Sequence, residues 1–193
     1  MISNLSVVLA SGSPRRQHLL LDLVEDFEIF VPEVDEDALT VEDPQETAIK
    51  LATAKAEAVF AVRQDCLVIG GDTVVAIPNE DGTFTQLAKP SSKKDAERML
   101  RLLSGRTHLV ITGVCLIWAD GRHVLSDTSQ VTFKEMTPAE IKDDVATGEP
   151  LDKAGAYACQ GGAKKFIERI DGSLTNVIGL PTEKLQQAME SLG

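Results

Sequence analysis

Hydrophobic patterns of two different periods alternate along the first half of the chain, and this alternation restricts the fold more than any other feature. Residues 7–10 form a short apolar run typical of a buried strand, and residues 15–24 carry leucines at helical spacing. Residues 44–62 repeat the helical pattern behind Pro44, and residues 67–70 repeat the buried strand, with Gly71 expected to open a turn. Strands separated by helices in this way indicate an α/β fold.

The second half of the chain adds a hairpin to this pattern. Residues 108–118 and 122–133 are strand-like, and Ala119-Asp120-Gly121 joins them as a tight turn. A hairpin beside parallel strands requires a mixed sheet. The other expected elements are a hairpin tip at 79–82, a helix from Ser91 or Ser92 to 103, a helix from the capping box at Thr137 to about 146, a strand at 165–170 and a final amphipathic helix.

Length and charge narrow the class of protein. At 193 residues we expect a single domain, residues 1–193, and no apolar run reaches the roughly 18 residues that span a membrane. The N-terminus has no export pattern and the three cysteines form no CxxC pair, so a cytoplasmic protein with reduced thiols is expected. The net charge of −11 disfavours long nucleic acid as a partner. A small polyanion would need concentrated local cations.

Two arginines stand where a helix disfavours them. Arg15 and Arg16 fall in the first turn of the helix that Ser13 caps and Pro14 begins. The partial positive charge of a helix start disfavours cations there, so a bound phosphate would explain their presence. A pair of solvated surface arginines is an equally good interpretation of this segment by itself.

Lys55 is the second basic residue in an unusual place. Ala48, Ala52 and Val59 lie at helical spacings that put Lys55 on the apolar side of its helix. The ammonium would then point inward or toward a cleft. The alternative is that its aliphatic stem lies along the packed surface and its charge reaches water.

Carboxylates supply the other half of a possible site. Asp72 follows the strand at 67–70, and open α/β sheets bind ligands at the carboxyl ends of their strands. An Asp that caps the next turn is the alternative. Asp35 and Glu36 belong to an acidic run that reads as solvated loop, although its oxygens could complete a magnesium site. Sequences typical of P-loops, nucleophile elbows and zinc proteases are absent from the chain.

Six motifs in order resemble the Maf family of nucleoside triphosphate pyrophosphatases. They are Ser11-Gly12-Ser13-Pro14-Arg15-Arg16, Gly71-Asp72-Thr73, Lys89-Pro90, Leu103-Ser104-Gly105-Arg106-Thr107-His108, Asp152-Lys153-Ala154-Gly155-Ala156-Tyr157 and Gly179-Leu180-Pro181. The resemblance implies an α/β fold with a mixed, strongly twisted sheet, whose flanking helices form two lobes around a deep cleft, as in Maf and ITPase proteins. It also implies a homodimer and a divalent cation, Mg²⁺, Mn²⁺ or Co²⁺.

The same resemblance implies roles for particular residues. Asp72 looks like the proton acceptor and, with Glu36, a metal ligand. Substrate-binding residues by likeness are Ser11, Arg15, Arg16, Lys55, Thr73, Lys89, Lys153 and Gln160. The stretch around Gln160 is similar to the subgroup that acts on dTTP and UTP, and a carboxamide can pair with the N3–H and a carbonyl of uracil or thymine.

The implied reaction is hydrolysis between the α and β phosphates, giving a nucleoside monophosphate and pyrophosphate. Two other functions stay open on the sequence: a nucleotide-sensing regulator of septum formation, and a pyrophosphatase that prefers a modified base such as 7-methyl-GTP.

Overall fold

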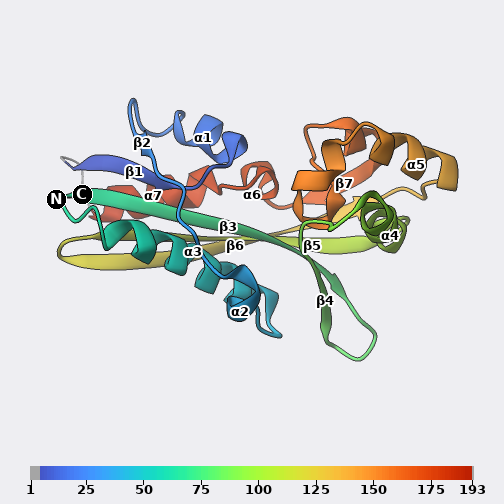
Figure 1. The fold of residues 1–193 in the computed structure, drawn as a ribbon, viewed down its shortest axis with the longest axis horizontal. Helices are drawn as coiled ribbons and strands as arrows, with labels where there is room; N and C mark the ends of the chain where they lie inside the picture. The colour runs from blue at the N-terminus through green and yellow to red at the C-terminus, as the bar shows by residue number, and fades with distance from the viewer. Residues whose placement is uncertain (1–4, 193) are drawn as a thin grey trace.

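The strands of the chain form one mixed sheet. In the computed structural model, which describes residues 5–192, this sheet has seven strands in the order β2-β1-β3-β5-β6-β7, with β4 paired to β3. Strand β1 is parallel to β2 and β3, and the remaining pairs are antiparallel. The sheet is strongly twisted, and the long strands β3, β5 and β6 run its whole length (Figure 1). The predicted mixed α/β fold is confirmed.

The helices and strands have the following bounds. The strands are β1 (Ser6–Ala10), β2 (Glu28–Ile29), β3 (Cys66–Pro78), β4 (Phe84–Leu87), β5 (Thr107–Trp118), β6 (Gly121–Phe133) and β7 (Ile167–Asp171). The α-helices are α1 (Pro14–Leu20), α2 (Glu36–Leu39), α3 (Pro44–Phe60), α4 (Lys93–Leu103), α5 (Pro138–Ala146), α6 (Leu174–Ile178) and α7 (Thr182–Leu192). Three short 3-10 helices, η2 (Glu149–Asp152), η3 (Ala154–Ala156) and η4 (Gly162–Phe166), lie between α5 and β7.

The helices gather into two lobes that the long strands connect. Helices α1, α6 and α7 lie with β1 and β2 at one end of the sheet, and α4, α5 and β7 lie at the other (Figure 1). Helix α3 covers the opposite face of the first lobe and packs against β3 and β5. No helix within residues 5–192 is long and apolar enough to cross a membrane.

Strict alternation along the strands divides the core into two layers. Val8 and Val68 pack in the cluster beneath α3, whereas Leu9 and Ile69 pack in the larger cluster on the other face. Successive side chains of a strand point to opposite faces, so residues 8–10 of β1 and 66–69 of β3 are apolar and buried on both sides. All three cysteines are buried free thiols, as expected.

Helix α3 approaches the sheet so closely that two strand positions require glycine. A Cβ atom on Gly113 of β5 would lie 2.5 Å from the carbonyl oxygen of Ala48, and one on Gly70 of β3 would meet the backbone of Ala52 and Ala56. Alanines face these glycines along the helix, and Ala48, Ala52 and Ala56 are fully buried. The small residues on both sides therefore set the distance between α3 and the sheet.

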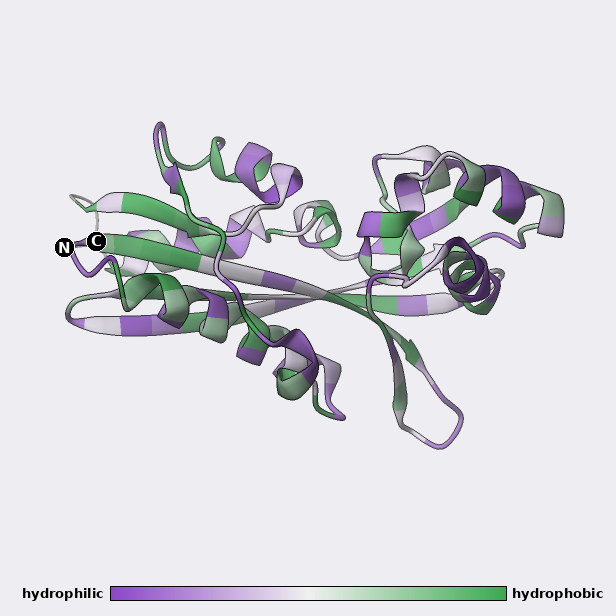
Figure 2. Cartoon of the chain, viewed as in Figure 1, coloured by the Kyte–Doolittle hydropathy of each residue, from purple (hydrophilic) through white to green (hydrophobic). Residues whose placement is uncertain are grey.

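The expected turn at Gly71 is wrong. Strand β3 continues without interruption from Cys66 through Gly70 and Gly71 to Pro78, and its hydropathy falls only in the middle of the strand (Figure 2). Glycines there serve close packing, because α3 covers Gly70 and the Arg16 side chain covers Gly71. Asp72 is consequently a mid-strand residue, and the two positions predicted for it, a strand end and a turn cap, are both corrected.

Other boundaries differ by smaller amounts. Helix α1 ends at Leu20, four residues earlier than expected, and the chain turns through Leu23, which still packs against the core. Strand β7 begins at Ile167 because Lys165 belongs to the 3-10 helix η4. The capping box predicted at Thr137 is present, with the Thr137 and Glu140 side chains bonded reciprocally to backbone N–H groups.

We expect Gly113→Ala to destabilise the protein strongly. The added methyl group overlaps the α3 backbone, which cannot shift without disturbing the sheet beneath it, so the free energy of unfolding should fall by about 1–3 kcal/mol or more. Urea denaturation measures this loss. Gly82→Asn in the β3–β4 turn is the control: no atom lies within 4 Å of its added Cβ, its φ is +85° and Asn tolerates that backbone. Equal effects of the two substitutions would contradict the close-packing argument.

Candidate active site

A cleft of about 760 Å³ lies between the two lobes. It opens where β3 has no strand beside it on one edge. Strand β1 pairs with β3 only as far as Gly70, and β4 begins to pair at Val75, so within the described residues no strand pairs with residues 71–74 on that side. At such a gap both faces of β3 are accessible, and Asp72 and Thr73 line the same cleft although they point to opposite faces.

The cleft is lined from both ends of the molecule. Residues after β1, at the start of α1 and along α3 contribute one wall, and residues after β4 and around η3 contribute the other. The lining includes Ser11, Arg15, Arg16, Glu36, Lys55, Asp72, Thr73, Lys89 and Lys153. Every predicted site residue except Gln160 thus lies on one cavity.

Lys55 and Asp72 form a close ion pair in the cleft. The Lys55 Nζ lies 2.6 Å from Oδ1 of Asp72 and 2.7 Å from Oε1 of Glu36. The Lys55 and Asp72 side chains are only 14% and 12% exposed, whereas Glu36 is half exposed. The expectation that Lys55 points inward is confirmed. The alternative, in which its ammonium extends along the surface into water, is wrong. Close packing of α3 on the sheet brings the ammonium to β3.

Glu36 is ionised more readily than an ordinary glutamate. Its partial burial opposes ionisation, but the hydrogen bond and positive charge of Lys55, with the charge of Lys89 beyond, outweigh that effect and lower its pKa. The acidic run was expected to be a solvated loop. Instead Asp35 caps a short helix through the N–H of Ala38, and this helix points Glu36 at Lys55.

The guanidinium of Arg16 is held by three hydrogen bonds inside the protein. Its Nε donates to the Gly179 carbonyl at 2.8 Å, Nη1 donates to Ser11 Oγ at 3.2 Å and Nη2 donates to Thr73 Oγ1 at 3.0 Å. Burial lowers the pKa of Arg16, and the negative charge of Asp72 acts in the opposite direction. Arg16 is therefore a fixed cation rather than a solvated surface residue. Its two remaining N–H donors have no partner among residues 5–192 and can bind a ligand.

The other predicted cations surround this centre. Arg15 is half-buried on the cleft and Lys89 is exposed on it. Lys153 is buried, and its Nζ donates to the Glu149 carbonyl and to Asp152 Oδ1, both at 2.6 Å. Gln160 is exposed and is not among the described residues that line the cleft, although Ala158 and Cys159 beside it are. The structure does not bring Gln160 to the other site residues.

Sequence reasoning missed several cleft residues because they carry no chemical signal. Thr47 and Gln86 line the cleft, and each also bonds to the backbone of Val41 and so holds the segment before α3. Val177 and Ile178 of α6 give the cleft an apolar wall. Neither periodicity nor motif spacing predicted α6, which follows directly on the turn after β7.

Tyr157 connects the cleft to a buried histidine. Its hydroxyl lies 2.7 Å from Nε2 of His108, and both rings pack edge-on against Phe133. Nδ1 of His108 has no hydrogen-bond partner among the described residues. Burial lowers the pKa of His108 to about 4 and raises that of Tyr157, so both side chains are neutral near pH 7 and the pair anchors the wall that carries Lys153.

The fold and the charges of the cleft together indicate a protein that binds a phosphorylated small molecule. The fold is a twisted mixed α/β sheet with a cleft between two lobes. Five cationic side chains and two converging carboxylates line this cleft, in a chain of net charge −11. Cations concentrated against the overall charge are suited to a phosphorylated small molecule.

The chain belongs to the Maf-like protein family, whose pattern it matches over residues 6–192. A protein of Symbiobacterium thermophilum named dTTP/UTP pyrophosphatase is 42% identical over 97% of this chain and 94% of its own length. A protein of Vibrio parahaemolyticus with the same name is 41% identical over 98% of both chains. Among solved structures, a HAM1 protein from Coxiella burnetii is similar in fold, with a TM-score of 0.50, 14% identity and coverage of 97% of this chain and 99% of its own.

The buried His108 makes stability depend on pH. Its pKa is about 6.5 when unfolded and about 4 when folded, so the unfolded state binds more protons between these values. The contribution of the neutral imidazole is complete above pH 6.5 and is lost as the pH falls toward 4, about 2–3 kcal/mol by pH 4.5.

Urea denaturation of the wild type and His108→Gln at pH 7.5 and 4.5 tests this sign. The difference in unfolding free energy between the two proteins should shrink at the lower pH, because Gln cannot titrate. Carboxylates titrate in both proteins and cancel in the comparison. A difference that does not change with pH would contradict the buried neutral state.

Proposed function

We propose that this protein hydrolyses nucleoside triphosphates between the α and β phosphates and releases a nucleoside monophosphate and pyrophosphate, with dTTP, UTP and modified pyrimidine nucleotides as substrates. The observation that carries the proposal is Asp72, a nearly buried carboxylate held by Lys55 on a cleft that also holds Arg15, Arg16 and Lys89. Family membership and the names of the relatives support the same reaction.

The cations of the cleft bind the triphosphate in this proposal. Arg16 offers its two free N–H donors in a fixed direction, while Arg15, Lys89 and Lys153 lie around it on the same cavity. Each charge-assisted hydrogen bond to a phosphate oxygen contributes on the order of 1.5–3 kcal/mol. A few such bonds offset the repulsion of an acidic protein surface.

Asp72 acts on the attacking water. As general base its carboxylate accepts the proton of a water that attacks the α phosphorus in line with the leaving pyrophosphate. Lys55 holds that carboxylate in place until substrate binds. Lys55 pairs with both Asp72 and Glu36, and its ammonium can also pair with a phosphate group of the substrate when the substrate binds.

The carboxylates suit a divalent cation. Glu36 and Asp72 converge on one positive charge, the Lys55 ammonium, from 2.7 and 2.6 Å, so their oxygens can also converge on a metal ion. No group of three metal-ligating side chains occurs in the part of the chain described here, and phosphate oxygens and waters would complete the shell of Mg²⁺, Mn²⁺ or Co²⁺ held by Glu36 and Asp72. Such an ion supplies charge stabilisation at the phosphates and lowers the pKa of bound water.

Asp72→Asn should abolish most of the activity while the protein stays folded. The amide has the shape of the carboxylate but cannot accept the proton, so pyrophosphate release from dTTP with Mg²⁺ should fall by a factor of about 10²–10⁴. Turnover within threefold of the wild type would rule out this role. Tight nucleotide binding by the wild type without metal-stimulated pyrophosphate release would instead favour the sensor function.

Two lysines of α3 provide a matched test of the cation site. Lys55→Met keeps the length of the buried side chain and removes its charge, so kcat/KM for dTTP should fall by about 10- to 100-fold or more. Lys50→Met removes the same charge from the same helix, where Lys50 pairs with Glu46 at 2.8 Å on the surface, and should keep activity within twofold of the wild type. Equal losses in the two variants would show a general charge effect instead.

Homodimer formation, a single domain and a cytoplasmic location remain predictions that rest on the sequence and the family resemblance.

A further inference from the structure

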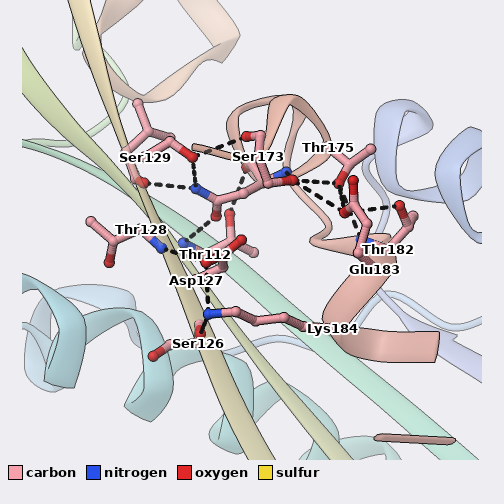
Figure 3. A network of polar contacts seen from close by, with 12 residues as sticks. Thr112, Ser126, Asp127, Thr128, Ser129, Ser173, Thr175, Thr182, Glu183 and Lys184 are labelled. Carbon is pink, nitrogen blue, oxygen red and sulfur yellow. Dashed lines mark hydrogen bonds and ion pairs between the residues drawn. The ribbon is translucent and has the colours of Figure 1, made fainter. Parts of the chain in front are cut away.

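The two sides of the cleft are held in different ways. On the side of α6, Thr73 Oγ1 lies 2.9 Å from Thr112 Oγ1, and the Thr112 hydroxyl donates at 2.9 Å to the backbone carbonyl of Asn176, which is fully buried. Thr112 belongs to the network of polar contacts drawn in Figure 3, which joins β5 and β6 to the segment around α6. Hydrogen bonds therefore connect this side of the cleft to the core.

On the other side lies a strap, defined here as residues 31–42, which runs between β2 and α3, contains α2 and partly lines the cleft. None of the residues 31–42 is buried. The strap contains no Lys or Arg, and its carboxylates are those of Glu33, Asp35, Glu36, Asp37 and Glu42. Burial does not fix such a segment, and a phosphorylated ligand would repel it, so polar contacts must hold it in place.

Hydrogen bonds and ion pairs from other elements reach the strap at two places in the described part of the chain. The first is the carboxylate of Glu36, through its ion pair in the cleft. The second is the backbone of Val41, whose N–H donates to Thr47 Oγ1 at 3.1 Å and whose carbonyl accepts from Gln86 Nε2 at 2.6 Å. Gln86 Nε2 also donates to the Glu42 carbonyl at 3.3 Å. Thr47 and Gln86 thus clamp the end of the strap.

Helix α2 connects the two places. It runs from Glu36 to Leu39, and the Thr40 hydroxyl after it donates to the Glu36 carbonyl at 3.1 Å. The Thr40 N–H donates to the Asp37 carbonyl at 3.3 Å. A hydrogen-bonded helical turn therefore lies between Glu36 and Val41, so the position of Val41 determines where the Glu36 carboxylate lies.

The clamp also relates the strap to two cations of the cleft. Thr47 lies on α3 together with Lys55, and Gln86 lies on β4, three residues before Lys89. The charges of both lysines act on Glu36 and lower its pKa. The clamp therefore ties the strap to the parts of the chain that place these two cations.

We propose that Thr47 and Gln86 are positioning residues that clamp Val41 and so hold the Glu36 carboxylate beside Lys55. The inference rests on the proposed function, because Glu36 is one of the two carboxylates of that site. The Thr47 hydroxyl and the Gln86 amide bond to the backbone of the strap, so neither needs to touch the substrate. Without the clamp the strap occupies its place for only part of the time, and the rate falls with that fraction.

Thr47→Val and Gln86→Met remove the two clamping groups with little change in side-chain size. Each should lower kcat/KM for pyrophosphate release from dTTP by about tenfold. Thr47→Ser keeps the hydroxyl and should stay within about twofold of the wild type. Thr85→Val is the matched control on β4, because Thr85 is exposed and its hydroxyl donates to Asn79 at 3.1 Å. It should also stay within about twofold.

A Glu36→Gln background separates positioning from general damage. If the clamp acts through the Glu36 carboxylate, Thr47→Val and Gln86→Met should each change kcat/KM by less than about twofold once that carboxylate is gone, whereas independent effects would multiply. Equal losses in the two backgrounds would show that Thr47 and Gln86 act on the substrate or on the fold, and would overturn the inference. Wild-type kcat/KM in both Thr47→Val and Gln86→Met would overturn it as well.

Amide hydrogen exchange of the strap is a second measurement, which needs no turnover. Exchange within residues 31–42 should become about tenfold faster in Thr47→Val and Gln86→Met and stay at the wild-type rate in Thr47→Ser. This measurement decides if Glu36→Gln leaves no measurable rate, or if one clamp variant fails to fold, since unchanged exchange in the other variant would overturn the inference.

The wild type distinguishes this inference from the proposed function. An active wild type whose clamp variants lose equally in both backgrounds would end the inference and leave the hydrolase standing. A wild type that releases pyrophosphate from no nucleoside triphosphate, with Mg²⁺ or Mn²⁺ present, would end the hydrolase proposal and the inference together.

Discussion

The structure of the site depends on how closely helix α3 packs against the sheet. Glycines at positions 70 and 113 leave no side chain between the strands and the helix backbone, and buried alanines on α3 complete the contact. A helix held at this distance can place a lysine directly on a strand carboxylate. A larger residue at either glycine would lift α3, and the Lys55 ammonium would no longer reach Asp72 at hydrogen-bond distance.

A gap in the strand pairing supplies the space for a ligand. Strand β1 ends beside Gly70 and β4 begins beside Val75, so the edge of β3 is open between them and the two lobes face each other across it. The gap explains why consecutive residues on opposite faces of a strand can serve one site. Open α/β sheets bind ligands at the carboxyl ends of their strands. Asp72 fits this rule although it lies in the middle of β3, because the carboxyl end of the neighbouring strand β1 lies beside Gly70.

Polar groups in the cleft are organised in two layers. Charges face the cavity, where Lys55 holds two carboxylates and Arg16 is fixed by its surroundings. Behind them, neutral groups form a chain of hydrogen bonds that connects Asn176 in the core through Thr112 to Thr73 at the cleft. In such a chain each hydroxyl group has only one possible arrangement of donor and acceptor. The donors and acceptors that face the cleft are therefore determined before a ligand binds.

The amino-acid sequence by itself determined the local elements, the excess of acid over base, and the residues that stand against local preference. It singled out Arg15, Arg16 and Lys55, which line one cleft in the structure, because helix periodicity and capping are properties of neighbouring residues. It could not show that β3 runs through Gly70 and Gly71, that Glu36 contacts Lys55, or that Gln160 is exposed and not among the described residues that line the cleft. These depend on strand register and on helix-to-sheet distance, which bring together residues far apart in the chain. Only the tertiary structure decided these features, because strand register and helix-to-sheet distance are set by the packing of side chains from different elements and not by local propensity.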